Sequence, residues 1–338
     1  MPEGATQRGA PRIKDVARRA GVSPATVSRV LNNTARVAPP KAAQVHRAIE
    51  ELGFRPSSLA RGLSIGRTGS VGVIAPFFSH AGTLARLEGI TDAAGGAGYD
   101  VMIFNVASPR QRADAFSKFA RRDRVDGLVV ASIPVSDEEV AAFARERLPV
   151  VLIDVAHTAL ARVTIDDVAG GRLATEHLLG RGHARIGFVG DLAASPLGFT
   201  ASERRHEGYA GALAAAGVAA DRALVRRGPH GRESARTLAR DLLASPERPT
   251  AVFAASDTQA AGVLQAAADH NLDVPGELAV IGFDDIDLAE ILGLTTVRQP
   301  LAEMGANAFA LLASELGGED PDPVEIVHPL SLVQRGTT

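Results

Sequence analysis

The chain has 338 residues, contains no cysteine and carries a formal net charge of −3 at neutral pH. The absence of cysteine excludes a disulfide framework, thiol catalysis and cysteine metal sites, and it is compatible with a reducing cytoplasm. The charge is unevenly divided, because residues 1–67 hold 12 Lys and Arg against 4 Asp and Glu, whereas the remainder hold 24 against 35. The basic N-terminal residues 1–67 suit binding to a polyanion, and the acidic remainder of the chain discourages nonspecific binding of the polyanion to that remainder.

The N-terminus lacks an apolar run of signal-peptide length, and no segment reaches the roughly eighteen apolar residues that a membrane span requires. We therefore expect a cytoplasmic protein with no membrane partner. Residues 1–11 are rich in Pro and Gly and show no periodicity, which predicts a disordered leader.

Residues 12–54 predict a small domain of three helices. Gly21 ends the first helix, Ser23 offers an N-cap oxygen to the second, and Pro24 fits the first position of that second helix. Pro39 and Pro40 fit only the first turn of the third helix. Apolar residues at helical spacing form the predicted stripes: Ile13, Val16, Ala17 and Ala20; Val27, Val30 and Leu31; Ala43, Val45, Ala48, Ile49 and Leu52.

The outer face of the second helix carries small, hydrogen-bonding residues and a single arginine, a composition that fits a groove. Two short helices joined by a glycine turn are also a common packing unit. The spacing alone therefore does not decide between a unit that binds in a groove and one that only packs. The residue identities are more specific. The run A-G-V-S-x-x-T-V-S-R-V-L-N, Ala20 to Asn32, closely resembles the helix-turn-helix of the LacI/GalR family of bacterial transcription regulators, and the resemblance covers nearly the whole chain.

This resemblance implies that the second helix enters the major groove of DNA. Arg29 would then read a guanine, an interaction worth about 1–3 kcal/mol of discrimination. The other implied DNA-binding residues are Pro24 and Ala25, at positions that vary with operator sequence, and Thr26, Ser28 and Asn32, which contact phosphate or position the helix.

Residues 55–69 allow two interpretations. Three glycines, among them Gly62, make a helix here unstable alone, so composition favours a flexible linker. The resemblance instead implies a hinge that becomes helical on operator DNA, where Leu63 enters the minor groove and Ala60 packs beside it.

From residue 70 onward, short apolar strands alternate with amphipathic helices, which predicts parallel sheets covered by helices on both faces. The strands are expected at 71–76, 100–104, 126–131, 150–154, 185–190, 223–225, 250–256 and 278–285. The helices are expected at 83–97, 111–122, 136–147, 169–181, 202–216, 232–244 and 257–270.

This α/β pattern restarts once, so residues 70–338 are predicted to form a core of two similar doubly wound lobes with a ligand site between them. The family resemblance extends here to periplasmic sugar-binding proteins. It implies an N-lobe of about 70–164 and 297–328, a C-lobe of about 165–296 and 329–338, and crossings near Thr164, Thr296 and Leu330.

The resemblance also implies which residues bind a small effector. Arg205 and Asp284 match positions that bind ligand hydroxyls or carboxylates, and their chemistry suits a sugar-like molecule. Ser256, Gln299 and His230 are further candidates, and for each of the five the alternative is a structural polar contact. Family members often carry S-N-P-F-F after the first strand, with aromatic residues that stack on the ligand. This chain has S-H-A-G-T at 79–83 instead, and either Phe77 or Phe78 could substitute.

Parts of the sequence also fit two rival functions. Asp166 with Asp167, or Asp284 with Asp285, could form the acid/base pair of a glycoside-acting enzyme, but strand-end aspartates commonly serve as caps, and the sequence contains neither G-x-x-x-x-G-K-[ST] nor H-E-x-x-H. A sugar-binding protein without a regulatory role is disfavoured by the DNA-binding head and by the missing signal peptide. His177 and His183 do not share a helical face, so we expect no metal.

The resulting prediction is a ligand-responsive transcription regulator, most simply a repressor, that is not an enzyme and needs no cofactor. It would bind a pseudo-palindromic operator as a homodimer. Binding of the effector would change its affinity for the operator allosterically. No leucine heptads follow the last strand, so a dimer is expected rather than a tetramer.

Overall fold

A computed structural model of the protein describes residues 11–32, 37–54, 67–77, 80–119, 121–318 and 323–338. The chain divides into two compact units, Met1–Gly69 and Ser70–Thr338. The leader up to residue 10, the hinge residues Ala60 and Leu63, and Phe78 lie outside the described residues, so the expectations attached to them stay predictions.

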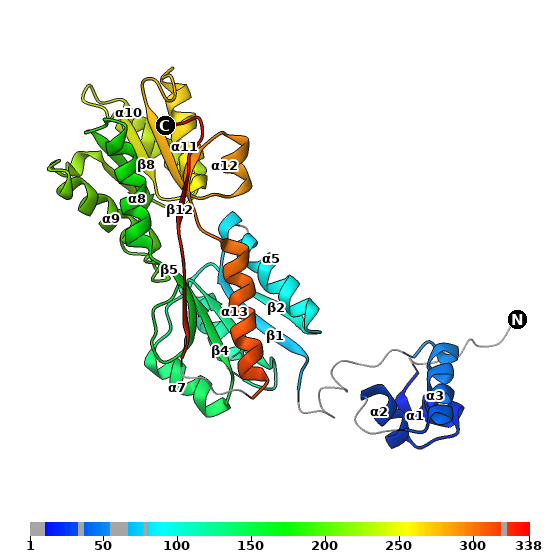
Figure 1. Ribbon diagram of the computed structural model, residues 1–338. Coiled ribbons are helices and arrows are strands. Elements are labelled where there is room, and N and C mark those ends of the chain that lie inside the picture. The colour runs from blue at the N-terminus through cyan, green and yellow to red at the C-terminus, as the bar shows by residue number, and fades with distance from the viewer. Residues whose placement is uncertain (1–10, 33–36, 55–66, 78–79, 120, 319–322) are drawn as a thin grey trace, which may run out of the picture. The chain divides into compact units, whose positions relative to one another are not determined.

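The first unit contains the three predicted helices, α1 (Ile13–Ala20), α2 (Pro24–Asn32) and α3 (Pro39–Leu52) (Figure 1). Gly21 follows α1 with φ 66°, a left-handed conformation that suits a residue without Cβ. The Oγ of Ser23 accepts a hydrogen bond from the backbone N–H of Thr26 at 3.1 Å, as expected of an N-cap. The small core is formed by Val16, Ala17, Val27, Val45 and Ala48.

One residue of the predicted stripes was wrong. Ala43 is exposed, whereas its neighbour Ala42 is half-buried. Ala42 lies three residues before the buried Val45, and Ala43 lies only two before it, so the period of 3.6 residues in α3 places Ala42 nearer the buried face.

In the described part of the second unit, two six-stranded sheets form two lobes (Figure 1). The N-lobe sheet has the order β11-β5-β4-β3-β1-β2, with β1 (Ser70–Pro76), β2 (Asp100–Val106), β3 (Gly127–Ala131), β4 (Val150–Ile153), β5 (Ala161–Ile165) and β11 (Glu325–His328). The C-lobe sheet has the order β12-β10-β9-β8-β6-β7, with β6 (Ile186–Asp191), β7 (Val225–Gly228), β8 (Ala251–Ala254), β9 (Ala279–Asp284), β10 (Thr295–Arg298) and β12 (Ser331–Val333). The strands pair in parallel except β12, which runs antiparallel to β10.

Helices cover both faces of each sheet, as the alternation of strands and helices predicts. The N-lobe helices are α5 (Ala81–Gly96), α6 (Pro109–Phe119), α7 (Asp137–Glu146) and α13 (Leu301–Leu316). The C-lobe helices are α8 (Asp167–Gly180), α9 (Ala201–Ala215), α10 (Arg232–Leu243), α11 (Asp257–Asp269) and the short α12 (Asp287–Ile291). On β1, Val73 packs toward α5 and α13, whereas the next residue, Ile74, packs toward α6 and α7. None of the described helices is both long and apolar enough to cross a membrane.

The chain passes between the two sheets after β5, after β10 and between β11 and β12, and the residues named for these passages lie in or beside those strands. Thr296 on β10 is tied to the C-lobe, because its Oγ1 donates to Oδ1 of the buried Asp257 at 2.5 Å. The passage that follows β10 leads directly into α13 of the N-lobe.

Further differences concern whole elements. The strand predicted at 223–225 was wrong, because Arg222–Leu224 form a 3-10 turn whose Ala223 N–H donates to the carboxylate of Asp221 at 2.8 Å. The strand β7 begins only at Val225 and is an edge strand with two arginines, so it lacks the apolar pattern of its neighbours. Helices α12 and α13 and strands β5, β10 and β11 were not predicted as elements, and the Ala-rich sequence of α13 offers no sharp division into polar and apolar faces.

Reciprocal glycines bring two helix pairs into close contact. In the C-lobe, a Cβ on Gly208 of α9 would lie 2.0 Å from the carbonyl oxygen of Val168 on α8, and a Cβ on Gly171 of α8 would lie 2.0 Å from that of Arg205. In the N-lobe, Gly89 of α5 and Gly305 of α13 stand in the same relation to the carbonyl oxygens of Ala302 and Arg86, at 1.9 and 2.1 Å. Each contact fixes the helix that carries a buried arginine.

We predict opposite effects for two substitutions on α9. Gly208→Ala should destabilise the core by about 1–3 kcal/mol, because the added methyl group overlaps backbone atoms of α8. Gly211→Ala is the matched control, since its Cβ meets nothing within 4 Å, and it should be neutral or stabilising by about 0.5–1 kcal/mol. Urea unfolding measures both free energies, and equal effects would contradict the close helix contact.

Candidate functional site

A cavity of about 460 Å³ lies between the two lobes of the core. Its wall is built largely from residues at or just beyond the carboxyl ends of strands in both sheets, including Phe77 after β1, Asp154 after β4 and Asp284 at the end of β9. This is the place where doubly wound sheets bind ligands. The volume falls within the range of roughly 300–1,000 Å³ that is typical of small-molecule sites.

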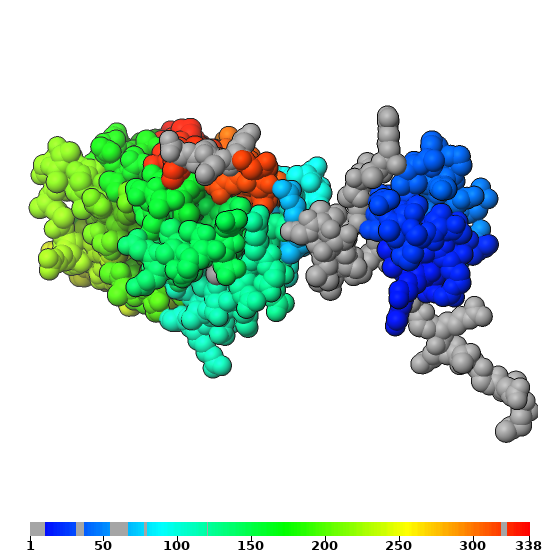
Figure 2. All heavy atoms as spheres, turned by 90° about the horizontal axis from the view of Figure 1, so that it is seen from below, coloured from blue at the N-terminus to red at the C-terminus, as the bar shows by residue number. Residues whose placement is uncertain are grey.

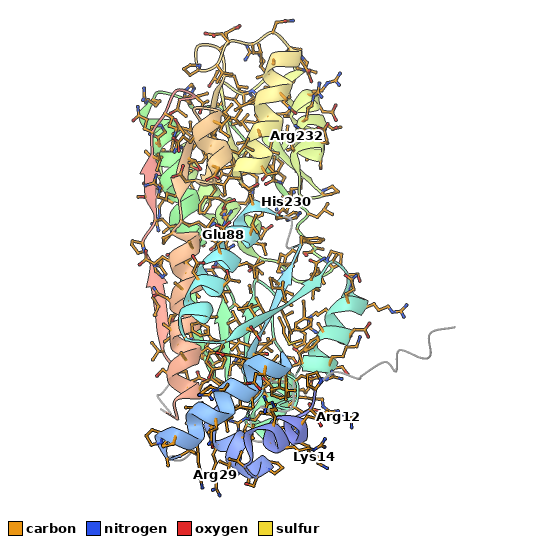
Figure 3. All side chains as sticks on the ribbon, turned by 90° about the vertical axis from the view of Figure 1, so that its right-hand side faces the viewer. Arg12, Lys14, Arg29, Glu88, His230 and Arg232 are labelled. Carbon is orange, nitrogen blue, oxygen red and sulfur yellow. The ribbon has the colours of Figure 1, made fainter. Side chains whose placement is uncertain are left out.

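The structure places all five predicted effector residues on the wall of this one cavity: Arg205, His230, Ser256, Asp284 and Gln299. They come from α9, the loop after β7, the start of α11, the end of β9 and the passage after β10. Figure 3 shows His230 at the junction of the lobes. Ser256 also caps α11, since its Oγ accepts from the backbone N–H of Gln259 at 3.2 Å.

Arg205 is buried and held on several sides. Its Nε donates to Oδ1 of Asp167 at 2.8 Å, and its Nη1 donates to the carbonyl oxygen of Ala255 at 2.6 Å. The same Nη1 lies 3.6 Å from Oδ1 of Asp284, and the guanidinium covers the ring of Phe283 at 3.6 Å from its centroid. Burial works against the charge of Arg205, but Asp167 and Asp284 outweigh it and raise the pKa of the guanidinium. The arginine therefore stays charged in the cavity wall.

A chain of polar contacts runs from one lobe to the other through Gln299. Its Nε2 donates to Oδ1 of Asp284 at 2.6 Å, and its Oε1 accepts from Nη2 of Arg86 on α5 at 3.2 Å. The same Nη2 of Arg86 donates to Oδ2 of Asp154 at 2.5 Å. Burial raises the pKa of both Asp154 and Asp284, while the neighbouring arginines oppose the rise.

Aromatic rings line the mouth of the cavity although the family's usual aromatic pair is missing. Phe77 stacks on His80 with ring centroids 4.9 Å apart, and His80 in turn lies 4.8 Å from His230 of the other lobe. Phe199 packs edge-on against Phe77 at 6.0 Å. Phe77 thus lies on the cavity wall, and its stacking on a ligand in place of the missing aromatic pair stays a prediction.

His230 forms an ion pair with Asp191 at the end of β6, with 3.0 Å between Nδ1 and Oδ1. Burial lowers the pKa of His230, but the hydrogen bond and the charge of Asp191 outweigh it, so the pKa is raised. His80 behaves in the opposite way, because burial and the neighbouring His230 lower its pKa.

Sequence reasoning missed several polar residues of the cavity wall, among them Arg86, Asp154 and Asp191. The two aspartates carried a usable signal, because each stands at or just after the end of a predicted strand. Arg86 lies inside a helix, where a single arginine is ordinarily solvated.

The residues considered for rival chemistries have structural partners. Asp166 caps α8 by accepting from the N–H of Ala169 at 3.0 Å, and Asp285 pairs with Arg298 and Arg335. The two histidines considered for a metal have separate partners, since His177 bonds to Thr338 and His183 to Thr250.

In the first unit, Pro24, Ala25 and Arg29 are exposed on α2, and Figure 3 shows the side chain of Arg29 extending away from the helix. Ser28 is half-buried, and the Oγ1 of Thr26 lies 2.9 Å from the Oγ of Ser23. Asn32 ends the helix, and its side chain lies outside the described atoms.

Comparisons with known proteins agree with both units. Residues 12–57 match the family described as bacterial regulatory proteins, lacI family, and residues 175–338 match a periplasmic binding protein-like domain. Catabolite control protein A of Priestia megaterium is 33% identical over 328 residues, which cover 95% of this chain and 98% of that protein. The HTH-type transcriptional repressor PurR of Yersinia pestis (strain Pestoides F) is 34% identical over 337 residues, which cover 96% of this chain and 95% of that protein.

Two solved structures are similar over nearly the full length. The Lac repressor dimer bound to operator and the anti-inducer ONPF has a TM-score of 0.84 and 25% identity, covering 97% of this chain and 98% of that chain. The complex of the transcriptional regulator CelR with cellobiose has a TM-score of 0.72 and 30% identity, covering 97% and 100%.

We predict that Asp191→Asn lowers the pKa of His230, because the amide keeps the shape of the carboxylate but not its charge. The pair stabilises the folded core fully below pH 6.5, the ordinary pKa of His, and the contribution is lost as the pH rises through the raised pKa. An NMR titration of the His230 ring measures the shift. Asp241→Asn, an exposed position on α10, is the control. An unchanged pKa in Asp191→Asn would contradict the ion pair.

Proposed function

The chain belongs to the LacI family of bacterial regulatory proteins, and we propose that it acts in the cytoplasm as a homodimeric repressor of a pseudo-palindromic operator. A helix-turn-helix for DNA and a core for a small effector are the parts that such a regulator needs. The observation that carries the proposal is the union of these parts in one chain, in which the five residues implied by the family resemblance line a single cavity. Neither an enzyme nor a binding protein without a regulatory role explains the DNA-binding head.

In the proposed reading of DNA, α2 enters the major groove and Arg29 donates two hydrogen bonds to a guanine. Its exposure and the basic charge of residues 1–67 support this role. Pro24 and Ala25 donate no side-chain hydrogen bonds, so they would meet apolar base edges. Thr26, Ser28 and Asn32 would position the helix on phosphates.

The proposed effector is a small, carbohydrate-like molecule bound by Arg205 and Asp284, with Gln299, Ser256 and His230 completing the wall. Guanidinium and carboxylate groups together supply the donors and acceptors that hydroxyl groups need. The similarity to the CelR complex with cellobiose adds support for this ligand class.

The effector would act by changing the closure of the two lobes. The polar chain through Gln299 joins residues of both lobes, so a ligand that contacts these groups favours one closure state over the other. Coupling of this kind between effector and DNA affinity typically amounts to about 1–3 kcal/mol.

A homodimer is supported by exposed apolar side chains on one side of the core. Leu84 on α5 is 49% exposed and Ile291 on α12 is 80% exposed, and Met102 and Ile103 on β2 are also exposed. The elements α5, β2 and α12 lie on the same side of the core in Figure 1. A patch of this kind marks an interaction surface, and a second copy would place two DNA-reading heads at a fixed spacing.

For the head, we predict that Arg29→Ala abolishes the preference for operator over random DNA and leaves salt-dependent binding to random DNA nearly intact. The operator is first obtained by selecting genomic fragments with the wild-type protein, and affinities are then measured by fluorescence anisotropy. Arg47→Ala on α3 is matched in charge and should lower both affinities alike, if at all. Equal loss of both affinities in Arg29→Ala would remove Arg29 from base reading.

For the dimer, we predict that Leu84→Asp or Ile291→Asp shifts the protein to monomers, because a buried unpaired carboxylate is costly at an interface. Analytical ultracentrifugation measures the state. Val327→Asp is the control, since Val327 is 57% exposed on β11, at the edge of the N-lobe sheet opposite to β2. Dimers that persist in both variants would place the interface elsewhere.

A further inference from the structure

A short sequence repeats at equivalent places in the two lobes. Residues 86–89 read Arg-Leu-Glu-Gly and residues 205–208 read Arg-His-Glu-Gly. The first run lies on α5, which follows β1, and the second lies on α9, which follows β6. In the two sheet orders, β1 and β6 occupy the same position, as do β4 and β9. The two arginines are therefore topological equivalents.

The packing around the two arginines repeats as well. The carbonyl oxygen of each arginine abuts a glycine of the neighbouring helix, Gly305 for Arg86 and Gly171 for Arg205. Each glycine three residues after the arginine abuts a carbonyl oxygen of the same neighbouring helix. Both lobes thus hold an arginine at the cavity by the same close contact of helices.

Each arginine also lies against an aspartate at the equivalent strand end. Arg86 bonds to Asp154 after β4, and Nη1 of Arg205 lies 3.6 Å from Asp284 at the end of β9. Both aspartates have positive φ angles, 55° and 118°, which non-glycine residues seldom adopt. The N-lobe thus presents to the cavity the counterpart of the Arg205–Asp284 pair.

The two pairs differ in how fully their polar atoms are used. Among the described side chains, Nε of Arg86 and Oδ1 of Asp154 are buried without a hydrogen-bond partner, although both residues line the cavity. Arg86 is 91% buried, and leaving such a donor unpaired costs free energy. Arg86 also borders a void of about 10 Å³, which has room for one water molecule at most.

We propose that Arg86 and Asp154 form a second effector-binding pair, the N-lobe counterpart of Arg205 and Asp284, and that together the pairs select a neutral molecule with hydroxyl groups at both ends. This inference rests on the proposed effector site and extends it to the other lobe. The pair carries one unpartnered donor and one unpartnered acceptor, which together match a hydroxyl group, because a hydroxyl both accepts and donates.

The same pair disfavours charged ligands. A carboxylate or phosphate would accept from Nε of Arg86 but would face the free oxygen of Asp154, with Asp284 and Asp191 also on the cavity wall. An ammonium group would face Arg86 and Arg205. A phosphorylated, oxidised or amino derivative of a sugar should therefore bind less well than the neutral sugar.

The test uses the full chain and compounds in matched sets: glucose, glucose 6-phosphate, glucuronate and glucosamine, the corresponding ribose and galactose derivatives, cellobiose and myo-inositol. Thermal shift identifies compounds that stabilise the wild type, and calorimetry then measures their affinities. We expect a neutral compound to bind and its charged derivatives to bind more weakly or not at all.

Arg86→Gln and Asp154→Asn should each weaken binding of that neutral compound by about 10- to 100-fold, the usual loss for a hydrogen bond to a charged group. Arg86→Lys keeps a cation for Asp154 but removes Nε, so it should weaken binding by at least about tenfold even where the fold is undisturbed. Asp154→Asn should also raise the relative affinity for glucuronate. Arg112→Gln removes a comparable N-lobe ion pair away from the cavity and should leave affinity unchanged.

Two results would overturn the inference. If Arg86 and Asp154 variants keep wild-type affinity while Arg205→Gln loses it, the cavity binds its effector from the C-lobe alone, and Nε of Arg86 serves a structural water. If a charged compound stabilises the wild type best, or no neutral compound does, the ligand class is wrong. In either case the operator experiment with Arg29→Ala still decides the proposed DNA-binding function independently.

Discussion

Two buried guanidinium groups, Arg86 and Arg205, set the constraint on which the cleft depends. A buried charge without a partner would cost far more than a small core can supply, so each arginine needs carboxylates placed within a few ångströms. Asp154 meets this need in one lobe, and Asp167 and Asp284 meet it in the other. Because Gln299 bonds to both Arg86 and Asp284, the charges of the two lobes belong to one connected set. A molecule that binds Arg86, Asp284 or Gln299 therefore acts on this connected set as a whole.

The backbone that supports these charges is equally specific. Glycines at the crossing points of α5 with α13 and of α8 with α9 let helices approach until backbone atoms touch, which no residue with a Cβ would permit. The helix contacts therefore hold the backbone of each arginine in place, in addition to the carboxylates that hold its guanidinium group. This rigidity allows a charged side chain to be directed into a cavity without the entropy that a free arginine would lose on binding.

Much of this arrangement could be predicted from the sequence, because it follows from local patterns. Helix caps such as Ser23, the apolar strand runs and the five candidate effector residues required only short-range spacing or a family motif. Other features depend on tertiary contacts. Ala42 is half-buried and Ala43 exposed because of the phase of α3, and the two arginines of the edge strand β7 mask its strand pattern. Arg86 was missed because an arginine inside a helix is normally solvated, and its meaning emerges only when the two lobes are compared.

That comparison bears on how such a core can regulate anything. A ligand shifts an equilibrium only by the difference in its affinity for the two states. A molecule held by one lobe alone would bind the open and closed cores equally and change nothing. Moving a population from 1:99 to 99:1 requires about 5.5 kcal/mol of differential binding. Hydrogen bonds to charged groups contribute about 1.5–3 kcal/mol each, so two to four such bonds on the second lobe would supply it. A charged pair on each side of the cavity meets that requirement, whereas a single pair does not.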